Sequence, residues 1–351
     1  MLRSFPTLDN PIGTVLKDDS SEKLHREVAT RWRHAEINSK LKLASFGFLR
    51  GLTTTSNIDH QEFFLRLPVE NILSHHSVRQ SPLRMLFDVE GLPNDVILAL
   101  FVIFEFYNDN SPWRYYLDML PMEFDTALYY TGEEIEQLQD MAIAQEIRQM
   151  QEKTRTVYDS VVPVLIEHDA KLFHPKIFTL ENFIWAQSVL DSRGIRLNVN
   201  GEATLCLLPL VDAINGATIS FLEGTTSVST DPNDSRESYS IRSLLPVKQG
   251  EQIFMNYGAF SNRELLLYYG YVVQPPLNVY DTYSFDLDID DGPAGEIQAA
   301  LLQRLGLSLD QHISVDGSIS DACLMTFHLL MMDHEELFLL LQVLRSRSKQ
   351  G

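Results

Sequence analysis

The sequence is poor in cysteine and contains no long apolar run. Cys206 and Cys323 are its two cysteines, too few for a disulfide framework or a cysteine metal site, so we expect a reducing compartment. The stretch Val96–Phe106 is interrupted by Glu105 and is too short to cross a bilayer, and the first residues lack the apolar core of a secretory signal. We therefore expect an intracellular protein, cytoplasmic or nuclear or within an organelle, with no membrane partner.

Positive charge is also scarce. The chain has 28 lysines and arginines against 48 aspartates and glutamates, which gives a formal net charge of −20. Because phosphate binding needs clustered cations, this balance argues against nucleic acid as the main partner. An acidic surface favours a basic protein segment or a cationic side chain instead. We expect a monomer that acts on a protein.

The composition is otherwise that of an ordinary globular protein. Hydrophobic residues make up 44% and charged residues 22% of the 351 residues, enough for a sizeable core and for two or three structural units. Strand-like, helical, strand-like and again helical segments follow one another along the chain. This order predicts an α+β fold in which a helical insert interrupts a β-rich unit.

The first half of the chain predicts short strands followed by helices. A helix is expected at Leu24–Ile37, and strands at Leu41–Leu43, Phe46–Leu52 and Phe63–Pro68. Asn94 is the expected N-cap of a buried helix, Asp95–Tyr107. Thr131 and Glu134 form a capping box. Behind it, apolar residues at helical spacing indicate one further helix: Ile135, Leu138, Met141, Ile147 and Met150.

The second half begins with another helix and returns to strands. We expect the helix at Leu180–Leu190, strand character from Glu202–Leu210 through Met255, and a surface loop at Thr225–Ser238. Pro275 and Pro276 introduce a last part. It should contain a strand at Thr282–Leu287, an acidic turn at Asp288–Gly292 and two or more helices up to Leu344.

The most informative stretch surrounds Tyr257. A turn at Gly250 leads into a strand, Ile253–Tyr257, and Gly258 allows the backbone to bend directly after it. Ser261 with Glu264 fits a capping box for the helix Asn262–Tyr269, which Gly270 can end. A tyrosine hydroxyl held at a strand end is a positioned polar group, as catalysis requires. The local pattern alone equally fits a tyrosine that packs its ring under the helix.

Four ordered segments together resemble one known family. They are Ser111–Pro121, Phe183–Arg193, Pro209–Asn215 and Gly250–Tyr271. In this order they are similar to the SET domain of protein methyltransferases, in the branch typified by the Rubisco large-subunit lysine methyltransferase. The resemblance implies a first SET segment in 1–80, a helical insert in 81–192, a second SET segment in 193–275, and the opening of a helical substrate-binding domain in 276–351.

The resemblance also implies a function. Members of this family transfer a methyl group from S-adenosyl-L-methionine to an amine or imidazole nitrogen of a protein side chain. Tyr257 matches the catalytic tyrosine, and the expected substrate is a protein lysine. The matching cofactor-binding positions are Phe48, Arg50, Arg193, Asn215, Gly216 and Tyr257, and the matching substrate-binding positions are Ser192, Arg193 and Tyr269.

Three positions depart from the family pattern, all of them at the cofactor. Leu49 stands where the family usually has a glycine, Phe48 where some members carry an acid, and Gly216 where a histidine normally follows the asparagine. We expect Gly216→His to hold or raise cofactor affinity. These departures keep two alternatives open: a SET-like scaffold that has lost methyl transfer, and a histidine methyltransferase with a wider, more polar channel.

Arg193 and the histidines also have plainer interpretations. Arg193 could bind the cofactor carboxylate, or equally satisfy helix-end carbonyls and pair with Asp212. The group Glu167–Asp169 with His174 lacks the spacing of a metal motif and is interpreted as a solvated helix end. His75 and His76 are expected at the surface. No metal cofactor is predicted.

Overall fold

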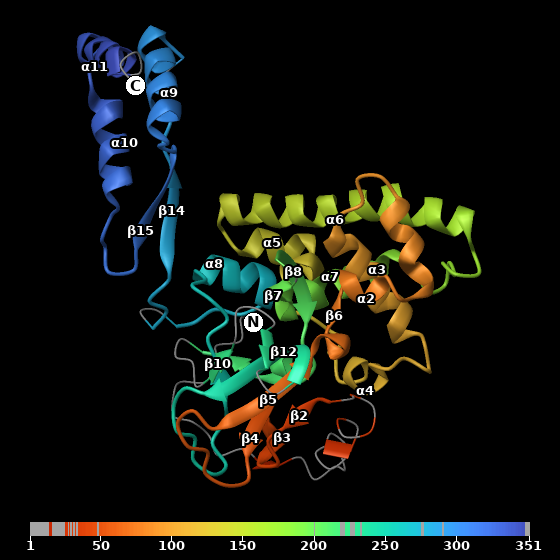
Figure 1. The fold of residues 1–351 in the computed structure, drawn as a ribbon. Helices are drawn as coiled ribbons and strands as arrows, with labels where there is room; N and C mark the ends of the chain where they lie inside the picture. Colours follow the sequence, from red (N-terminus) through yellow and green to blue (C-terminus); the bar gives the residue numbers. More distant parts are fainter. Residues whose placement is uncertain are drawn as a thin grey trace. The chain divides into compact units, whose positions relative to one another are not determined.

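The computed structural model in Figure 1 describes residues 14–15, 25–26, 28, 30, 32, 34–47, 49–199, 201–217, 222–224, 229–231, 234–274, 277–289 and 291–347. The chain divides into two compact units. The larger consists of Met1–Gly258 with Arg263–Val272, and the smaller of Ala259–Asn262 with Val273–Gly351. The mixture of helices and strands confirms the α+β prediction. The finer boundaries at 80, 192 and 275 stay a prediction.

The larger unit contains three small antiparallel sheets. The first pairs β1 (Thr14–Val15), β3 (Leu41–Phe46) and β4 (Leu49–Thr54). The second has the order β10 (Leu222–Gly224), β12 (Asp234–Ser243), β5 (Phe63–Pro68), β2 (Glu36–Ile37), with β11 (Ser229–Asp231) also on β12. The third has the order β6 (Leu73–Ser74), β8 (Glu202–Leu207), β7 (Ile195–Val199). The expected strands at 41–43 and 63–68 are thus confirmed.

One further pair of strands is parallel and decides where the functional residues lie. It joins β9 (Asn215–Gly216) to β13 (Phe254–Met255), with Asn215 opposite Phe254 and Gly216 opposite Met255. The two segments are nearly forty residues apart in the sequence. Their pairing brings the end of the Pro209–Asn215 segment beside the strand that leads into Tyr257.

The helices of the larger unit are drawn mainly in orange to yellow-green in Figure 1. The core helix is α3 (Asn94–Phe106), in which eight consecutive residues, Val96–Ile103, are buried, and it packs against α7 (Leu180–Arg193). The long helix α6 (Met141–His168) packs on α7 as well. Shorter helices are α2 (His75–Val78), α4 (Arg114–Leu117), α5 (Gly132–Gln137) and α8 (Asn262–Glu264).

Several local predictions hold. Thr131 and Glu134 make the expected capping box at the start of α5, where Glu134 N donates to Thr131 Oγ1 at 3.3 Å and the Glu134 carboxylate accepts from Thr131 N at 2.8 Å. The helix predicted from Leu180 begins there and continues to Arg193. Gly258 and Gly270 have positive φ angles of 142° and 74°, so both act as the predicted chain reversals.

Other predictions are wrong, mostly where the backbone changes direction. The stripe from Ile135 to Met150 belongs to two helices, because Gln139 adopts φ +55° and interrupts the helical path between α5 and α6. Asn94 is the first helical residue, and Pro93 is the N-cap. The segment Asn262–Tyr269 is only briefly α-helical, since Leu265–Tyr269 forms a π-helix.

Strand pairing overrides local composition at two further places. Glu36 and Ile37, expected at the end of a helix, pair with Arg66 and Leu65 of β5. Much of the predicted loop Thr225–Ser238 forms β11 and the start of β12, which pair with each other, while 225–228 and 232–233 lie outside the described residues. Both segments form backbone hydrogen bonds in a sheet, although their side chains do not predict a strand.

The smaller unit contains a hairpin-like pair of strands and three helices. The expected strand is β14 (Thr282–Asp286), and it pairs with β15 (Asp310–Ser314), which sequence patterns did not predict. The helices α9 (Pro293–Leu305), α10 (Asp321–Met331) and α11 (His334–Arg347) enclose an apolar cluster around Leu301, Leu302, Leu329 and Leu337. Pro275 and Pro276 lie outside the described residues.

No helix in the described part of the chain is both long enough and apolar enough to cross a membrane.

Candidate functional site

Most of the predicted site residues line one pocket of about 530 Å³ in the larger unit. They are Arg50, Ser192, Arg193, Asn215, Tyr257 and Tyr269. The lining also includes Leu49, the segment Asp118–Asp125, Asp212, Ala213, Gly270 and Tyr271. Gly216 follows Asn215 directly and lies against the Tyr257 ring. Phe48, the remaining predicted residue, lies outside the described residues. The sizes of small-ligand pockets run from about 300 to 1,000 Å³, so this one can hold a cofactor.

The Tyr257 hydroxyl is held by the backbone of Ile214 and of Gly216. It donates to the backbone carbonyl of Ile214 at 2.8 Å, directly before the parallel pair of β9 and β13. A carbonyl cannot donate, so the phenol proton lies on this bond and the phenol oxygen can only accept from the pocket. Burial raises the pKa of Tyr257 well above the usual value, although nearby Arg193 lowers it. The hydroxyl is therefore neutral at physiological pH.

Three tyrosines pack together at this end of the pocket. The Tyr257 and Tyr269 rings are stacked with their centroids 5.1 Å apart, and Tyr269 meets Tyr271 edge to face at 6.3 Å. Burial raises the pKa of Tyr269 to about 12, so it too stays neutral. Tyr269 ends the π-helical segment, a local geometry that often marks functional sites.

Gly216 has no room for a side chain. A Cβ atom there would lie 2.7 Å from Tyr257 Cε2 and 2.8 Å from Tyr271 Oη, closer than real Cβ contacts come. The Tyr257 and Tyr271 side chains thus fill the space beside Gly216 that a side chain there would occupy. The expectation that a histidine would fit at this position needs correction, because two rings would have to move to admit it.

Asn215 is held in a similarly close contact. Its Nδ2 donates to the backbone carbonyl of Arg50 at 3.1 Å. A Cβ on Gly51 would lie 2.8 Å from that same Nδ2 and 2.9 Å from Gln252 Nε2. Glycine at 51 is therefore what allows Asn215 to bridge β9 and β4. This bond uses one of the two N–H groups of the Asn215 amide, and its second N–H and its carbonyl oxygen remain as polar groups.

A buried carboxylate organises the cations of the pocket. Asp212 accepts a hydrogen bond from Tyr116 Oη at 2.9 Å, and Arg193 Nη1 lies 3.6 Å from its carboxylate and donates to its backbone carbonyl at 2.8 Å. Burial raises the pKa of Asp212, while Arg193, Tyr116 and Arg50 lower it. The interpretation that pairs Arg193 with Asp212 is thus what the structure contains.

That pairing leaves part of Arg193 available. Its Nε is buried and has no hydrogen-bond partner within the described part of the chain. Arg50 lies near enough that Arg193 lowers its pKa, after the larger effect of burial. Arg193 therefore pairs with Asp212, while Arg50 acts on the same carboxylate only through a longer-range charge interaction. The unbalanced positive charge favours an anionic ligand group there.

The rim of the pocket has the opposite sign. Asp118, Glu123 and Asp125 line it and are exposed. The Arg114 guanidinium forms an ion pair with Asp118. The Ser192 hydroxyl is used within α7, where it donates to the Ser188 carbonyl at 2.6 Å. Ser192 therefore lines the pocket without offering its hydroxyl proton to a ligand.

Sequence reasoning missed four residues that build this site. Asp212 and Tyr116 were seen only as a pairing partner and a core aromatic, yet together they fix Arg193. Tyr271 ends a matched segment and Gly51 follows Arg50, and neither was assigned a role. These residues act through contacts with residues far away in the sequence. The only signal for Tyr116, Asp212 and Tyr271 is that they lie within the matched segments, and Gly51 lies outside them.

Related sequences of established function are protein methyltransferases. The zebrafish (Danio rerio) actin-histidine N-methyltransferase is 28% identical over 298 residues, which is 82% of this chain and 48% of the relative. The chloroplastic fructose-bisphosphate aldolase-lysine N-methyltransferase of Arabidopsis thaliana is 30% identical over 244 residues, which is 69% of this chain and 49% of the relative. The chain thus spans about half the length of these curated relatives. No protein-family model matches it.

The solved structures show the same fold. The SET domain of LSMT, the Rubisco large-subunit methyltransferase, bound to lysine and AdoHcy, superposes with a TM-score of 0.76 and 22% identity. The match covers 93% of this chain and 74% of that one. The SET fold that the four sequence segments predicted is therefore confirmed.

The contact at Gly216 generates a test of the site's packing. We expect Gly216→Ala to lower the melting temperature, because the added methyl group overlaps two packed rings, at an expected cost of about 1–3 kcal/mol. Differential scanning calorimetry measures the change. Gly132→Ala is the matched control, since no atom lies within 4 Å of a Cβ at that helix start. Equal melting temperatures for the two variants would contradict the packing described above.

Proposed function

Because this chain has the SET fold of the Rubisco large-subunit methyltransferase branch, we propose that it is a protein methyltransferase that uses S-adenosyl-L-methionine and modifies lysine. The single observation that carries this proposal is the placement of Tyr257. Its neutral hydroxyl, fixed as an acceptor, lies in the pocket beside two arginines and Asn215. The names of the relatives support a protein substrate, and the geometry around Tyr257 favours lysine as the acceptor.

The pocket fits the cofactor in three respects. The buried, unpartnered Nε of Arg193 offers a charge-assisted hydrogen bond to a carboxylate such as the cofactor's. The carbonyl oxygen of Asn215 can accept from an ammonium group at the same end of the molecule. Glycines 51 and 216 keep the backbone of β4 and β9 close to the pocket, where a Cβ would intrude on its polar groups.

When bound, the sulfonium of this cofactor supplies an electrophilic methyl group. The protein's part is to hold the acceptor nitrogen in line and to keep it uncharged. The ring stack of Tyr257, Tyr269 and Tyr271 provides an apolar wall, and such surroundings disfavour an ammonium and lower its pKa. Tyr257 does not act as a base, since its raised pKa keeps it protonated.

The acceptor role of Tyr257 favours lysine over histidine. A neutral lysine nitrogen has two N–H groups besides its lone pair, so one N–H can donate to the Tyr257 oxygen while the lone pair points to the methyl group. The reacting nitrogen of a neutral imidazole carries no hydrogen and has nothing to donate. The phenol proton cannot serve it either, because it lies on the Ile214 carbonyl.

Two alternatives to a lysine methyltransferase have observations in their favour. The similarity to an actin-histidine N-methyltransferase over 82% of the chain favours histidine as the second candidate acceptor. A scaffold without methyl transfer would explain Leu49, which replaces the usual glycine and lines the pocket. Each alternative predicts a different outcome in the experiments that follow.

Cofactor binding is the first test. We expect isothermal titration of the purified chain to give micromolar binding of both S-adenosyl-L-methionine and S-adenosyl-L-homocysteine. Arg193→Gln should weaken both about tenfold or more, because it removes the cation that faces the ligand carboxylate. Arg196→Gln, an exposed arginine on β7 paired with Asp95, is the matched control. No binding by a chain with a cooperative melting transition would support the scaffold.

The role of Tyr257 is tested by removing one oxygen atom. We expect Tyr257→Phe to leave cofactor affinity nearly unchanged and to lower the rate of methyl transfer about 10²–10³-fold, since a positioned polar contact at the reacting centre is lost. Incorporation of tritiated methyl groups into proteins of a cell lysate measures the rate. Tyr239→Phe removes a hydroxyl from the buried strand β12 and should have no effect. An unchanged rate in Tyr257→Phe would remove that residue from catalysis.

The acceptor is identified by the labelled amino acid. We expect acid hydrolysis of the labelled lysate proteins to release methylated lysine, because the Tyr257 oxygen can orient only a nitrogen that still carries a proton. Amino-acid chromatography separates the products. Methylhistidine as the labelled product would overturn the lysine assignment and leave the methyltransferase proposal standing. Labelling by the wild type but not by Tyr257→Phe ties the product to this pocket.

A further inference from the structure

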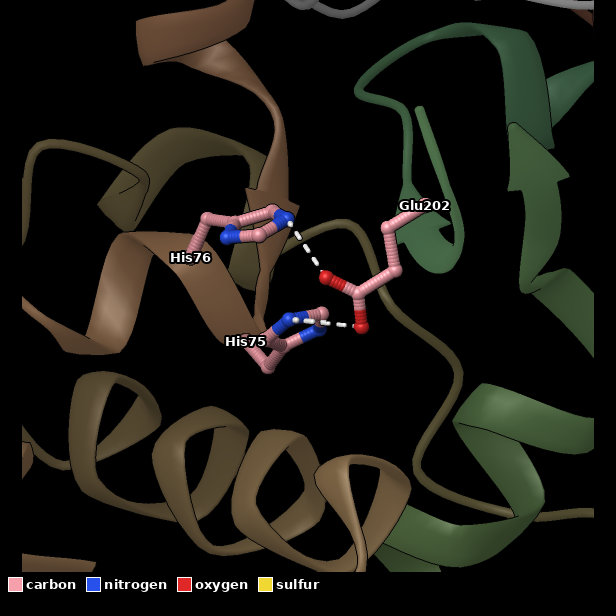
Figure 2. Close-up of side chains that lie close together, drawn as sticks. All are labelled: His75, His76 and Glu202. Carbon is pink, nitrogen blue, oxygen red and sulfur yellow. Dashed lines mark ion pairs between the residues drawn. The ribbon is translucent and has the colours of Figure 1, made fainter. Parts of the chain in front are cut away.

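His75, His76 and Glu202 form a cluster in the larger unit that shares no residue with the pocket described above. The two histidines open α2, and Glu202 begins β8. His75 Nε2 lies 3.7 Å from Glu202 Oε1, and His76 Nε2 lies 3.8 Å from Glu202 Oε2. Figure 2 shows both rings directed toward the one carboxylate. The expectation that these histidines lie at the surface is wrong for His75, which is 3% exposed.

The spacing of these atoms is unusual for an ion pair. At 3.7 and 3.8 Å the imidazole nitrogens are too far from the carboxylate for hydrogen bonds. Zn²⁺ binds nitrogen and oxygen at about 2.0–2.2 Å, so neighbouring ligands of a tetrahedral site lie about 3.3–3.5 Å apart. One ligand atom from each of the three residues lies within 4.8 Å of the other two. Movements of a few tenths of an ångström would bring the carboxylate oxygens to the ligand spacing of a metal site.

The charged groups that act on His75, besides His76 and Glu202, are Arg79 and Asp95. Among the described residues, the only ion pairs of Glu202 are with these two imidazoles. The acid next nearest, Asp95, is paired with Arg196 at 2.9 Å. His75 makes no hydrogen bond within the described part of the chain, and His76 has only a long contact of 3.4 Å to Thr204 Oγ1.

The surroundings resemble the outer shell of a metal site. Asn94 Nδ2 donates to Glu202 Oε1 at 3.2 Å and so orients the carboxylate. The Glu202 side chain is 51% exposed, which leaves an open side for a water molecule as a fourth ligand. The histidine rings are 4.0 Å apart and tilted by 40°, so both can face one ion.

From this geometry we infer that His75, His76 and Glu202 bind one Zn²⁺ ion, which ties the first turn of α2 to the start of β8. Two imidazoles and one carboxylate suit Zn²⁺ and similar transition metals, whereas Mg²⁺ and Ca²⁺ prefer sets made wholly of oxygen. The ion would join two elements that otherwise meet through the short pairing of β6 with β8. It is independent of methyl transfer.

The test is a Zn²⁺ titration of the tag-free chain after treatment with a chelator. We expect one equivalent of Zn²⁺ to bind in competition with a chromophoric chelator and to raise the melting temperature, while Mg²⁺ and Ca²⁺ do neither. Glu202→Gln keeps the size of an exposed side chain and should weaken Zn²⁺ binding at least about tenfold without unfolding the protein. His76→Gln should do the same.

A matched control separates this site from general binding to surface histidines. His168 is exposed at the end of α6, and His168→Gln should bind Zn²⁺ as the wild type does. Failure of the wild type to bind one equivalent would overturn the inference. So would equal affinity of Glu202→Gln and the wild type, because the bound ion would then lie elsewhere.

Discussion

The pocket depends on one close approach, that of the Gly216 backbone to the Tyr257 ring. The parallel pairing of β9 with β13 sets this distance, and the Tyr257 hydroxyl locks it by donating to the Ile214 carbonyl. Tyr271 then closes over the same glycine. A side chain at 216 would separate these groups, and the phenol oxygen would lose the orientation that makes it an acceptor. The departure from the family pattern at 216 is thus compensated by the aromatic residues around it.

The charge of the pocket is opposite to that of the whole chain. The whole chain carries a net charge of −20, whereas at the pocket Arg193 pairs with the buried Asp212 and Arg50 acts on the same carboxylate through its charge. Interactions at the base of the pocket are poorly screened by solvent, so the local balance outweighs the distant surface charges. The acidic rim then adds attraction for a cationic side chain. This arrangement suits a zwitterionic cofactor inside and a basic protein segment outside.

The sequence predicted those features that depend on residues close together in the chain, such as helix caps and glycine turns. The capping box of Thr131 with Glu134 and the reversals at Gly258 and Gly270 follow from the side chain or its absence at those residues. The break at Gln139 was not predictable, because a non-glycine residue takes a positive φ only when tertiary packing imposes it. The lack of space at Gly216 likewise arises from rings that lie more than forty positions away in the chain.

The segment from Glu202 to Asn215 is anchored at both ends by contacts with other elements. These anchors stabilise a strained residue in its middle. Leu210 has φ +74° and ψ −32°, a conformation that costs a branched side chain about 1–3 kcal/mol. Such a residue persists only where its neighbours are firmly fixed. On one side, β8 pairs with both β6 and β7. On the other, Tyr116 and Arg193 hold Asp212 two residues after the strained position. The turn at Leu210 therefore delivers Asp212 and Asn215 into the pocket at a fixed place, and loosening either anchor would let the backbone relax away from it.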